Sequence, residues 1–406
     1  MNKVLIDHVP ADFPVGFCLL STETVHYIAY YNADHEMVIV QRDINTEKSV
    51  TKIVPTKIGC DSHNYVTLAL DKDGHLHVSG NMHCVPLIYF RTQIAGDISS
   101  LEKAEMTGLI EDGVTYPVFF KTSEGDLVFT YRDGGSGCGS NYFNRYDCET
   151  TTWSRLVDGK IFDGDGKCNG YMIAPSKGPD GYFHVYGVWR DTPACETNHD
   201  LTYIRSKDLL NWENAFGEKQ ELPVNSDSST CFVDPIPAEG GIINGCIKHV
   251  FDQQDRIHLL YHKSDANGYM QIYVARIEND AWRIEQVSNF SDRIWFEGYG
   301  SMGFIGITLD KFEIIDDHLV IQYHHKTEGY GLITLDKNLN PQPHIKGDEA
   351  EAPILPKSNF PGMQVRRCND RSTNSAYLQW ETLSQNRDQQ REGDLPDPSP
   401  LYLIEE

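Results

Sequence analysis

The sequence lacks several features that would place it in common classes of protein. No window is apolar enough to span a bilayer, and the start, Met1–Ile6, lacks the apolar core of a signal peptide. No basic run is present: 35 Lys and Arg stand against 59 Asp and Glu, a formal net charge of -24. Such an acidic surface argues against nucleic acid and against anionic membranes as partners. We therefore expect neither partner, in a chain that is either cytoplasmic or the mature form of an exported protein.

Cysteine spacing excludes the common zinc motifs, because the ten cysteines include no Cys-x-x-Cys pair. The cysteines are also too dispersed for a small disulfide scaffold. Several could still be bridged: Cys138 and Cys148 bracket a glycine-rich hairpin, and four more stand near expected strand ends, namely Cys60, Cys84, Cys168 and Cys195. We therefore expect a secreted, extracellular protein with some disulfides.

Helical periodicity is scarce, whereas short alternating runs separated by Gly, Asp and Asn recur from end to end. One pattern, a turn followed by a strand that carries aromatic or histidine residues, occurs at 73–78, 124–131, 180–186, 255–262 and 317–324. The copies recur at roughly 50 to 75 residues, which is typical of propeller blades with loop insertions. Radial closure also removes exposed strand edges. The sequence predicts an all-β propeller forming one domain over 1–406, with a two-domain β-sandwich as the alternative.

The C-terminal part differs in composition from the rest of the chain. Residues 385–400 are polar and contain several prolines, so we expect a tail that runs over the surface. Residues 401–404 (Leu-Tyr-Leu-Ile) are apolar again. They are expected to return as the last strand, which closes the ring.

Two histidines flank a single predicted hairpin. The alternation over 66–70 describes a half-buried strand, Asp-Lys-Asp-Gly at 71–74 supplies a turn, and 76–78 resumes the period of two. Because His63 and His83 lie beyond the outer ends of the hairpin, they should emerge side by side at one edge of the sheet. They are candidates for a shared site, although hydrogen-bonded loop histidines would give the same pattern.

Two further polar clusters stand at expected strand ends. The first begins at Tyr131 and Arg132 and continues through a glycine-rich stretch to Arg145; the glycines let the backbone fold tightly and should bring these three side chains together. The second contains Arg190 and His199, and in a propeller it would face the same central depression. The arginines could instead pair with surface acids or join two blades.

These clusters combine His, Tyr and Arg without an obvious pair of carboxylates. A standard glycosidase needs two carboxyl groups that flank the scissile bond. Elimination from a uronate needs instead a positive group for the sugar carboxylate, a base for the C5 proton and an acid for the leaving oxygen. Arginine suits the first function, and histidine and tyrosine suit the other two. The loops therefore favour elimination over hydrolysis.

The joint occurrence of four motifs resembles the BNR-repeat superfamily of seven-bladed propellers, which includes ulvan lyases and L-rhamnose-α-1,4-D-glucuronate lyases. The motifs are Asp-Ser-His-Asn-Tyr at 61–65, Gly-Asn-Met-His at 80–83 with Pro-Leu-Ile-Tyr-Phe-Arg at 86–91, Tyr-Arg-Asp-Gly-Gly-Ser-Gly at 131–137, and the segment 189–200. The resemblance covers most of the chain. It implies a seven-bladed β-propeller and a carbohydrate substrate in which rhamnose is linked to glucuronate.

The resemblance also implies roles for individual residues. The expected catalytic residues are His63, His83, Tyr131, Arg145 and Arg190, and the expected substrate-binding residues are Asn64, Tyr65, Arg132 and His199. A structural Ca²⁺ ion in the central cavity is known among such propellers, and His199 and Asp234 are candidate inner-channel groups. No organic cofactor is expected.

We expect an exo-acting, monomeric lyase that removes terminal rhamnose from arabinogalactan or gum arabic, with ulvan lyase as the nearest variant. A related group of α-L-rhamnosidases works from the opposite face of the propeller with a histidine on the first strand, and this chain has His26 in that region. A hydrolase that uses His26 therefore stays open as an alternative, as does a glycan-binding propeller without activity.

Overall fold

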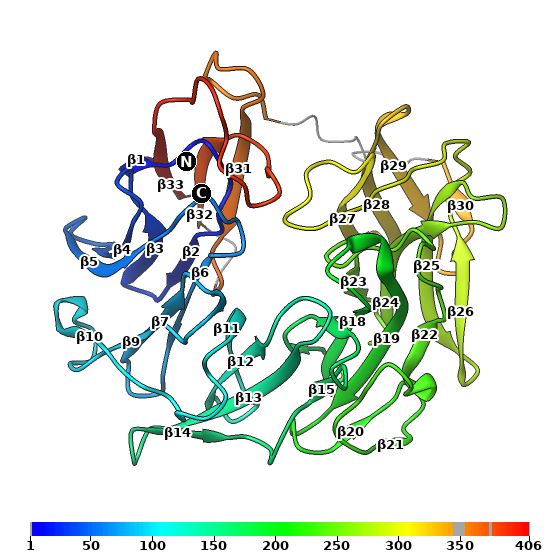
Figure 1. Ribbon diagram of the computed structural model, residues 1–406, viewed down its shortest axis with the longest axis horizontal. Helices are drawn as coiled ribbons and strands as arrows, with labels where there is room; N and C mark the ends of the chain where they lie inside the picture. Colours follow the sequence, from blue (N-terminus) through cyan, green and yellow to red (C-terminus); the bar gives the residue numbers. More distant parts are fainter. Residues whose placement is uncertain (1, 344–353, 373–375, 406) are drawn as a thin grey trace.

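In the described part of the chain, seven antiparallel sheets follow one another and are arranged in a ring (Figure 1). The computed structural model describes residues 2–343, 354–372 and 376–405. The ring confirms the expected all-β propeller, and the β-sandwich alternative is wrong. The described residues contain no helix that is long and apolar enough to cross a membrane.

The first three sheets come from the first 163 residues. The first contains β2 (Cys18–Ser21), β3 (Val25–Tyr31), β4 (Glu36–Asp43) and β5 (Ser49–Lys57). The second contains β6 (Val66–Leu70), β7 (Leu76–Gly80), β9 (Tyr89–Thr92) and β10 (Leu101–Lys103). The third contains β8 (His83–Val85), β11 (Val114–Lys121), β12 (Leu127–Asp133), β13 (Ser140–Asp147), β14 (Thr152–Arg155) and β15 (Phe162–Asp163).

The next three sheets continue the ring in the same order. The fourth contains β16 (Asn169–Met172), β17 (Ser176–Lys177), β18 (Phe183–Arg190), β19 (Asn198–Ser206), β20 (Trp212–Glu213), β21 (Lys219–Gln220) and β22 (Phe232–Asp234). The fifth contains β23 (Lys248–Phe251), β24 (Ile257–Ser264), β25 (Met270–Glu278) and β26 (Ala281–Gln286), and the sixth β27 (Ile307–Ile315), β28 (His318–His325), β29 (Gly329–Leu335) and β30 (Pro341–Gln342). Among the described residues, three short 3-10 helices lie in the connections, at Ile98–Ser100, Cys195–Thr197 and Ser229–Cys231.

The last sheet joins the two ends of the chain. It contains β31 (Gln364–Asn369), β32 (Ala376–Thr382) and β33 (Ser399–Glu405), and β33 also pairs with β1 (Asn2–Val9). The register places Asn2 opposite Glu405. Residues 401–404 therefore form the closing strand that the sequence predicts.

The hairpin that carries the two histidines forms as expected. Strands β6 and β7 pair with Val66 opposite Gly80, so the segments before Val66 and after Gly80 leave the sheet at the same end. The Asp71 carboxylate accepts hydrogen bonds from the backbone N–H groups of Asp73 and His75, and Gly74 has a φ of 84°, which a side chain would strain. The local sequence thus fixes which end of the sheet receives His63 and His83.

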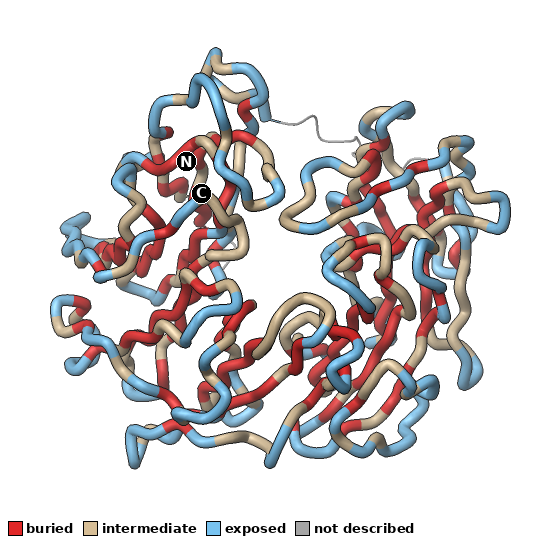
Figure 2. The backbone as a smooth tube through the Cα atoms, in the orientation of Figure 1, coloured by how far each residue is buried: buried red, intermediate tan, exposed pale blue. Residues whose placement is uncertain are grey.

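Buried apolar residues run along the inner strands of each sheet, while loops and outer strands carry the exposed residues (Figure 2). In the largest cluster, Ile28, Ile39 and Leu403 are fully buried, although they come from opposite ends of the sequence. Each such side chain contributes about 1.5 to 3 kcal/mol through burial. Packing between the first and last sheets therefore helps to hold the ring closed.

The expected disulfides are wrong, since all ten cysteines are free. Cys138 and Cys148 lie before and after β13, and an eight-residue strand separates its ends by roughly 25 Å. A disulfide needs Cα atoms within about 7 Å of each other. A single extended strand, β13, therefore lies between these cysteines in place of the expected hairpin.

Candidate active site

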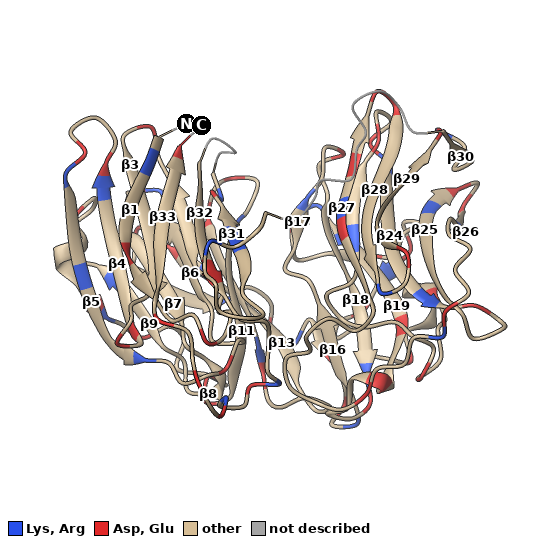
Figure 3. Ribbon diagram, turned by 90° about the horizontal axis from the view of Figure 1, so that it is seen from above, with Lys and Arg blue, Asp and Glu red and all other residues tan. Residues whose placement is uncertain are grey.

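A pocket of about 800 Å³ brings together polar side chains from distant parts of the chain. Its lining includes His63, His83, Tyr116, Tyr171, Arg190 and Asp388. Strand β8, which begins at His83, lies at the face of the ring opposite the two termini (Figure 3). The pocket therefore belongs to the end of the molecule where the loops between neighbouring sheets converge.

The carboxylate of Asp61 holds both histidines. Nδ1 of His63 donates to Oδ1 of Asp61 at 2.8 Å, and Nδ1 of His83 donates to Oδ2 at 2.5 Å. The two ring centroids lie 4.2 Å apart. The structure thus confirms that the hairpin places His63 and His83 side by side, and it adds the acid that orients them.

A second carboxylate approaches His63 from the C-terminal part of the chain. Oδ2 of Asp388 lies 3.2 Å from Nδ1 of His63, and it also accepts the backbone N–H of Ser301 at 2.8 Å. Its Oδ1 accepts the backbone N–H of Ser62 at 3.2 Å. The start of the segment expected at the surface, 385–388, therefore contributes to the pocket, and Asp388 ties the histidine loop to the loop before β27.

The two carboxylates place a positive charge on His63. Burial alone lowers the pKa of His63, but hydrogen bonds to Asp388 and Asp61 outweigh burial and raise it to about 9. Burial alone raises the pKa of the Asp61 carboxyl, but hydrogen bonds from His63 and His83 hold it well below its usual range. His63 is accordingly an imidazolium at neutral pH, flanked by two carboxylates.

His83 has a different environment. Its side chain is 30% exposed, and Nδ1 donates to Asp61. In the neutral tautomer this donation leaves Nε2 as a hydrogen-bond acceptor. His83 is therefore the histidine equipped to accept a proton.

Tyr116 reaches the pocket through a β-bulge. It has a φ of 58° and lies where the register of β11 shifts, between Thr115 and Val118. Its ring lies 5.8 Å from that of His63. Burial raises the pKa of the Tyr116 hydroxyl, so it stays protonated. The sequence held a signal for this residue, because Pro117 inside a strand indicates a bulge that redirects neighbouring side chains.

Two buried arginines stand beside the pocket. The guanidinium of Arg132 lies 4.9 Å from the ring centre of Tyr116 and 5.6 Å from that of Tyr171, and that of Arg190 lies 4.2 Å from Tyr171. Arg132 is 1% exposed and Arg190 8% exposed. Nη1 of Arg132 has no hydrogen-bond partner among the described residues, and neither arginine forms an ion pair there. Buried cations without a carboxylate partner favour an anionic ligand.

Polar groups other than carboxylates fix Arg190 at the pocket. Its Nε donates to Oδ1 of Asn198 at 3.0 Å, its Nη1 donates to the Tyr171 hydroxyl at 3.2 Å, and its Nη2 donates to Oδ1 of Asn244. These neutral partners orient the guanidinium but leave its charge uncompensated. Arg190 thus lies where the sequence places it.

Two of the expected catalytic residues lie outside the pocket. Tyr131 follows the alternation of the strand and points to the opposite face of the sheet from Arg132. Its side chain is therefore buried away from the pocket, and its hydroxyl donates to the backbone oxygen of Ile110. Arg145 lies at the far end of β13, roughly 17 Å along the strand from Ser140. It is exposed and pairs with Asp126. The glycines thus do not bring these three side chains together, which corrects the expectation.

The expected substrate-binding residues also separate. Asn64 accepts the Tyr31 hydroxyl on its backbone oxygen, and Tyr65 lines a smaller pocket of about 310 Å³ together with Tyr116 and Tyr171. The ring of His199 is not part of the lining of the main pocket. Its Nδ1 and Nε2 contact two carboxylates, those of Asp200 at 2.8 Å and Asp191 at 3.1 Å.

The residues suggested for calcium do not fit that ion. Asp234 already accepts from the Tyr261 hydroxyl and pairs with Lys263, and both ring nitrogens of His199 face carboxylates. Calcium prefers a set of oxygen ligands. In the described chain one cluster of three potential metal ligands is present, Asp61 with His63 and His83, and its two nitrogens do not suit calcium either. Calcium elsewhere in the central cavity stays a prediction.

His26 lies on the other face of the ring. It is 5% exposed, Nδ1 lies 2.5 Å from the Ser21 hydroxyl and Nε2 lies 3.1 Å from the Glu405 carboxylate. Tyr31 stands at the opposite end of β3 from His26, and its hydroxyl donates to the backbone oxygen of Asn64 near the pocket. His26 therefore lies at the end of the strand that is far from the pocket. Both ring nitrogens of His26 thus have partners, and no observation here favours the hydrolase alternative. Its role stays a prediction.

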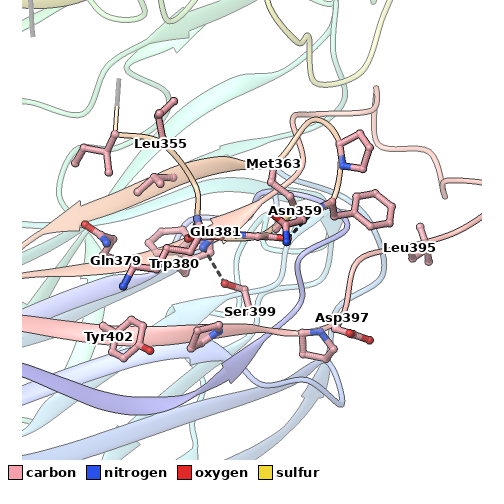
Figure 4. Close-up of a pocket in the computed structure, with 18 of the residues that line it drawn as sticks. Leu355, Asn359, Met363, Gln379, Trp380, Glu381, Leu395, Asp397, Ser399 and Tyr402 are labelled. Carbon is pink, nitrogen blue, oxygen red and sulfur yellow. Dashed lines mark hydrogen bonds between the residues drawn. The ribbon is translucent and has the colours of Figure 1, made fainter. Parts of the chain in front are cut away.

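A second pocket, of about 660 Å³, lies against β31, β32 and β33 (Figure 4). The Glu381 carboxylate there accepts the backbone N–H groups of Lys357 and Ser358, and its own N–H donates to the Ser399 hydroxyl. The described lining includes no histidine and no arginine. The histidines and arginines that the proposed elimination needs therefore gather in the larger pocket.

A model of BNR repeat-containing family members matches residues 25–290. The short isoform of ulvan lyase from Alteromonas sp. (strain LOR) is 30% identical over 142 residues, which cover 31% of this chain and 27% of that protein. The long isoform from Glaciecola sp. (strain KUL10) is 49% identical over 57 residues, 13% of this chain and 6% of that protein. The matches thus span about a quarter or less of these relatives.

Two solved structures resemble the whole chain. The polysaccharide lyase Uly1 has a TM-score of 0.64 at 15% identity, covering 99% of this chain and 98% of that chain. A PL25 ulvan lyase bound to -[GlcA(1-4)Rha3S]- has a TM-score of 0.62 at 13% identity, covering 100% and 96%. At these identities the likeness supports the propeller fold.

Proposed function

The chain belongs to the BNR repeat-containing family, and we propose that it is a polysaccharide lyase that cleaves a glycan of rhamnose linked to glucuronate by β-elimination. One observation carries the proposal: two buried arginines without carboxylate partners stand beside a histidine pair and a protonated tyrosine. The matches to ulvan lyases support the lyase class, and the PL25 ulvan lyase bound to -[GlcA(1-4)Rha3S]- suggests the two sugars.

Arg190 would bind the uronate carboxylate, and the charge of the buried Arg132 would add to the positive potential there. Arg190 lines the pocket, and Arg132 lies behind Tyr116 and Tyr171. A carboxylate bound by a guanidinium withdraws electron density from C5 and stabilises the anion that forms when the C5 proton leaves.

His83 would act as the base and Tyr116 as the acid. Nε2 of His83 takes the C5 proton, the electron pair forms the C4–C5 double bond, and the C4–O4 bond breaks. The Tyr116 hydroxyl gives its proton to the departing O4. The products are an unsaturated uronate and a rhamnose end with a new hydroxyl group. Asp61 keeps Nδ1 of His83 protonated, so Nε2 carries the lone pair.

The narrower parts of the proposal concern substrate and architecture. We propose an exo-acting enzyme for rhamnose caps of arabinogalactan or gum arabic. We also propose that each sheet of the ring forms one blade. An extracellular location and a monomeric state, expected from the sequence, stay predictions.

Incubation with gum arabic and, separately, with ulvan tests the proposal. Ultraviolet absorbance of the unsaturated uronate and free rhamnose are recorded together. We expect absorbance on at least one substrate, with free rhamnose alongside it if the enzyme is exo-acting. Rhamnose without absorbance would indicate a hydrolase, and saturable binding without either signal would indicate a glycan-binding propeller.

A further inference from the structure

Exposed aromatic rings gather on one side of the active-site pocket. Five Trp, Tyr and Phe side chains are exposed in the described part of the chain, and four of them lie between residues 295 and 330: Trp295 (57%), Tyr299 (67%), Phe304 (49%) and Tyr330 (43%). The fifth, Phe216, lies in a turn of the fourth sheet between β20 and β21. Exposed apolar surface concentrated in this way marks a binding region.

Three rings of this region form an ordered stack. The ring of Phe304 lies 4.5 Å from that of His324 at an interplanar angle of 15°, and His324 lies 4.2 Å from Tyr330 at 6°. His324 and Tyr330 are register partners in β28 and β29, so the hairpin itself sets their spacing. The two outer rings, Phe304 and Tyr330, keep a large exposed fraction although each already stacks on His324.

The stack continues directly from the pocket. Tyr299 lines the pocket, and so do Gly303 and Ile305, the neighbours of Phe304 in the chain. Thr308 also lines it and pairs with His324 across β27 and β28. The aromatic rings thus extend the pocket wall onto the sixth sheet.

Hydrogen bonds fix the loop that presents Tyr299. The backbone N–H of Gly298 donates to Glu196 at 2.9 Å, and its oxygen accepts from Cys195 at 2.7 Å. On the other side of Tyr299, the N–H of Ser301 donates to Asp388 at 2.8 Å. Both flanks of the exposed ring are therefore held by distant parts of the chain, which is the arrangement of a preformed binding surface.

We propose that Tyr299 and the Phe304–His324–Tyr330 stack bind sugar residues of the substrate that extend beyond the cleavage pocket. Aromatic faces bind the apolar C–H faces of sugar rings, and a deoxy sugar with a methyl group suits them well. With a net charge of -24, the protein gains no long-range attraction for a polyanion, so an uncharged contact suits this surface. The identity of the sugar rests on the proposed function. This aromatic platform, Tyr299 with the Phe304–His324–Tyr330 stack, makes KM depend on chain length.

The test compares Tyr299→Ala and Tyr330→Ala with Phe216→Ala, the exposed aromatic away from the pocket. Kinetics are measured on rhamnosyl-glucuronate oligosaccharides from two to eight residues long, each with rhamnose linked to O4 of a glucuronate. We expect KM on the longest chains to rise roughly two- to tenfold in both platform variants and to stay the same in Phe216→Ala. Tyr330 lies outside the pocket lining, so Tyr330→Ala should leave kcat and the kinetics on the disaccharide unchanged. Equal KM values across the three variants on all lengths would overturn the platform.

Binding separates this inference from the proposed reaction. Calorimetry with the octasaccharide is carried out in a His83→Ala background, where no cleavage is expected. Weaker binding in the platform variants, together with no unsaturated product from the wild-type protein, would leave the platform in place and contradict the lyase. Unsaturated product from the wild type with unchanged binding in the variants would contradict the platform alone.

Discussion

The ring centroids of His63 and His83 lie 4.2 Å apart, at an interplanar angle of 32°, and both rings direct Nδ1 to the same carboxylate. Two imidazoles at this distance disfavour a charge on both. His63 contacts a second carboxylate, that of Asp388, so the charge settles on His63. His63 is therefore the charged member of the pair, and His83 is the proposed base.

Replacing the base should abolish turnover but not binding. For His83→Ala we expect kcat to fall about 10²- to 10⁴-fold, because a positioned general base contributes that much. Production of unsaturated uronate on ulvan or gum arabic measures the loss. His26→Gln is the control, since His26 is buried on the opposite face. The assignment of His83 fails if His83→Ala keeps full eliminative activity.

The acid can be tested with a change of one atom. In Tyr116→Phe the leaving oxygen loses its proton donor, so we expect kcat to fall about 10²-fold with KM nearly unchanged. Tyr131→Phe is the matched control: it removes a hydroxyl that donates to Ile110 outside the pocket, and should lower stability by about 1 kcal/mol without changing kcat. Equal kcat values for the two variants would exclude Tyr116 as the acid.

The carboxylate-binding role of Arg190 predicts a loss that depends on substrate charge. We expect Arg190→Lys to raise KM roughly 10- to 100-fold on a uronate-containing oligosaccharide, because lysine lacks the fork that binds a carboxylate. Binding of the carboxyl-reduced oligosaccharide should be nearly the same in both proteins. Arg145→Lys serves as the control, since Arg145 is exposed and pairs with Asp126. An equal loss on the charged and the reduced ligand would point to a structural effect instead.

The raised pKa of His63 predicts a dependence of stability on pH. The folded pKa of about 9 lies above the ordinary value of 6.5, so the stabilisation is fully present below about pH 6.5 and is lost as the pH rises through 9. We expect the free energy of unfolding of the wild type to exceed that of His63→Gln by up to about 3 kcal/mol at pH 6, and by much less at pH 10. Urea titrations at the two pH values measure the difference. A difference that grows with pH would contradict the assigned charge.

Local patterns predicted the parts of the site that one hairpin determines. The turn at 71–74 fixed the β6–β7 hairpin, and this in turn placed His63 and His83 together. Asp388 was missed because its contact with His63 joins segments more than 300 residues apart, which no local pattern reports.

The errors among the tyrosines and arginines have a similar physical origin. Tyr131 and Arg132 are neighbours in one strand, so their side chains point to opposite faces of the sheet. The bulge at Pro117 places Tyr116 at the pocket, a position that strand alternation does not give. Register and bulges therefore decided which members of each cluster reach the site.

The mass of the uronate-containing product tests the central claim most directly. A defined rhamnosyl-glucuronate oligosaccharide is digested with the wild-type protein, and the fragments are analysed by mass spectrometry. Elimination predicts a uronate fragment that is lighter by one water than the hydrolysis product, formed together with ultraviolet absorbance and lost in His83→Ala. A fully hydrated uronate fragment, with no dehydrated one, would contradict the account.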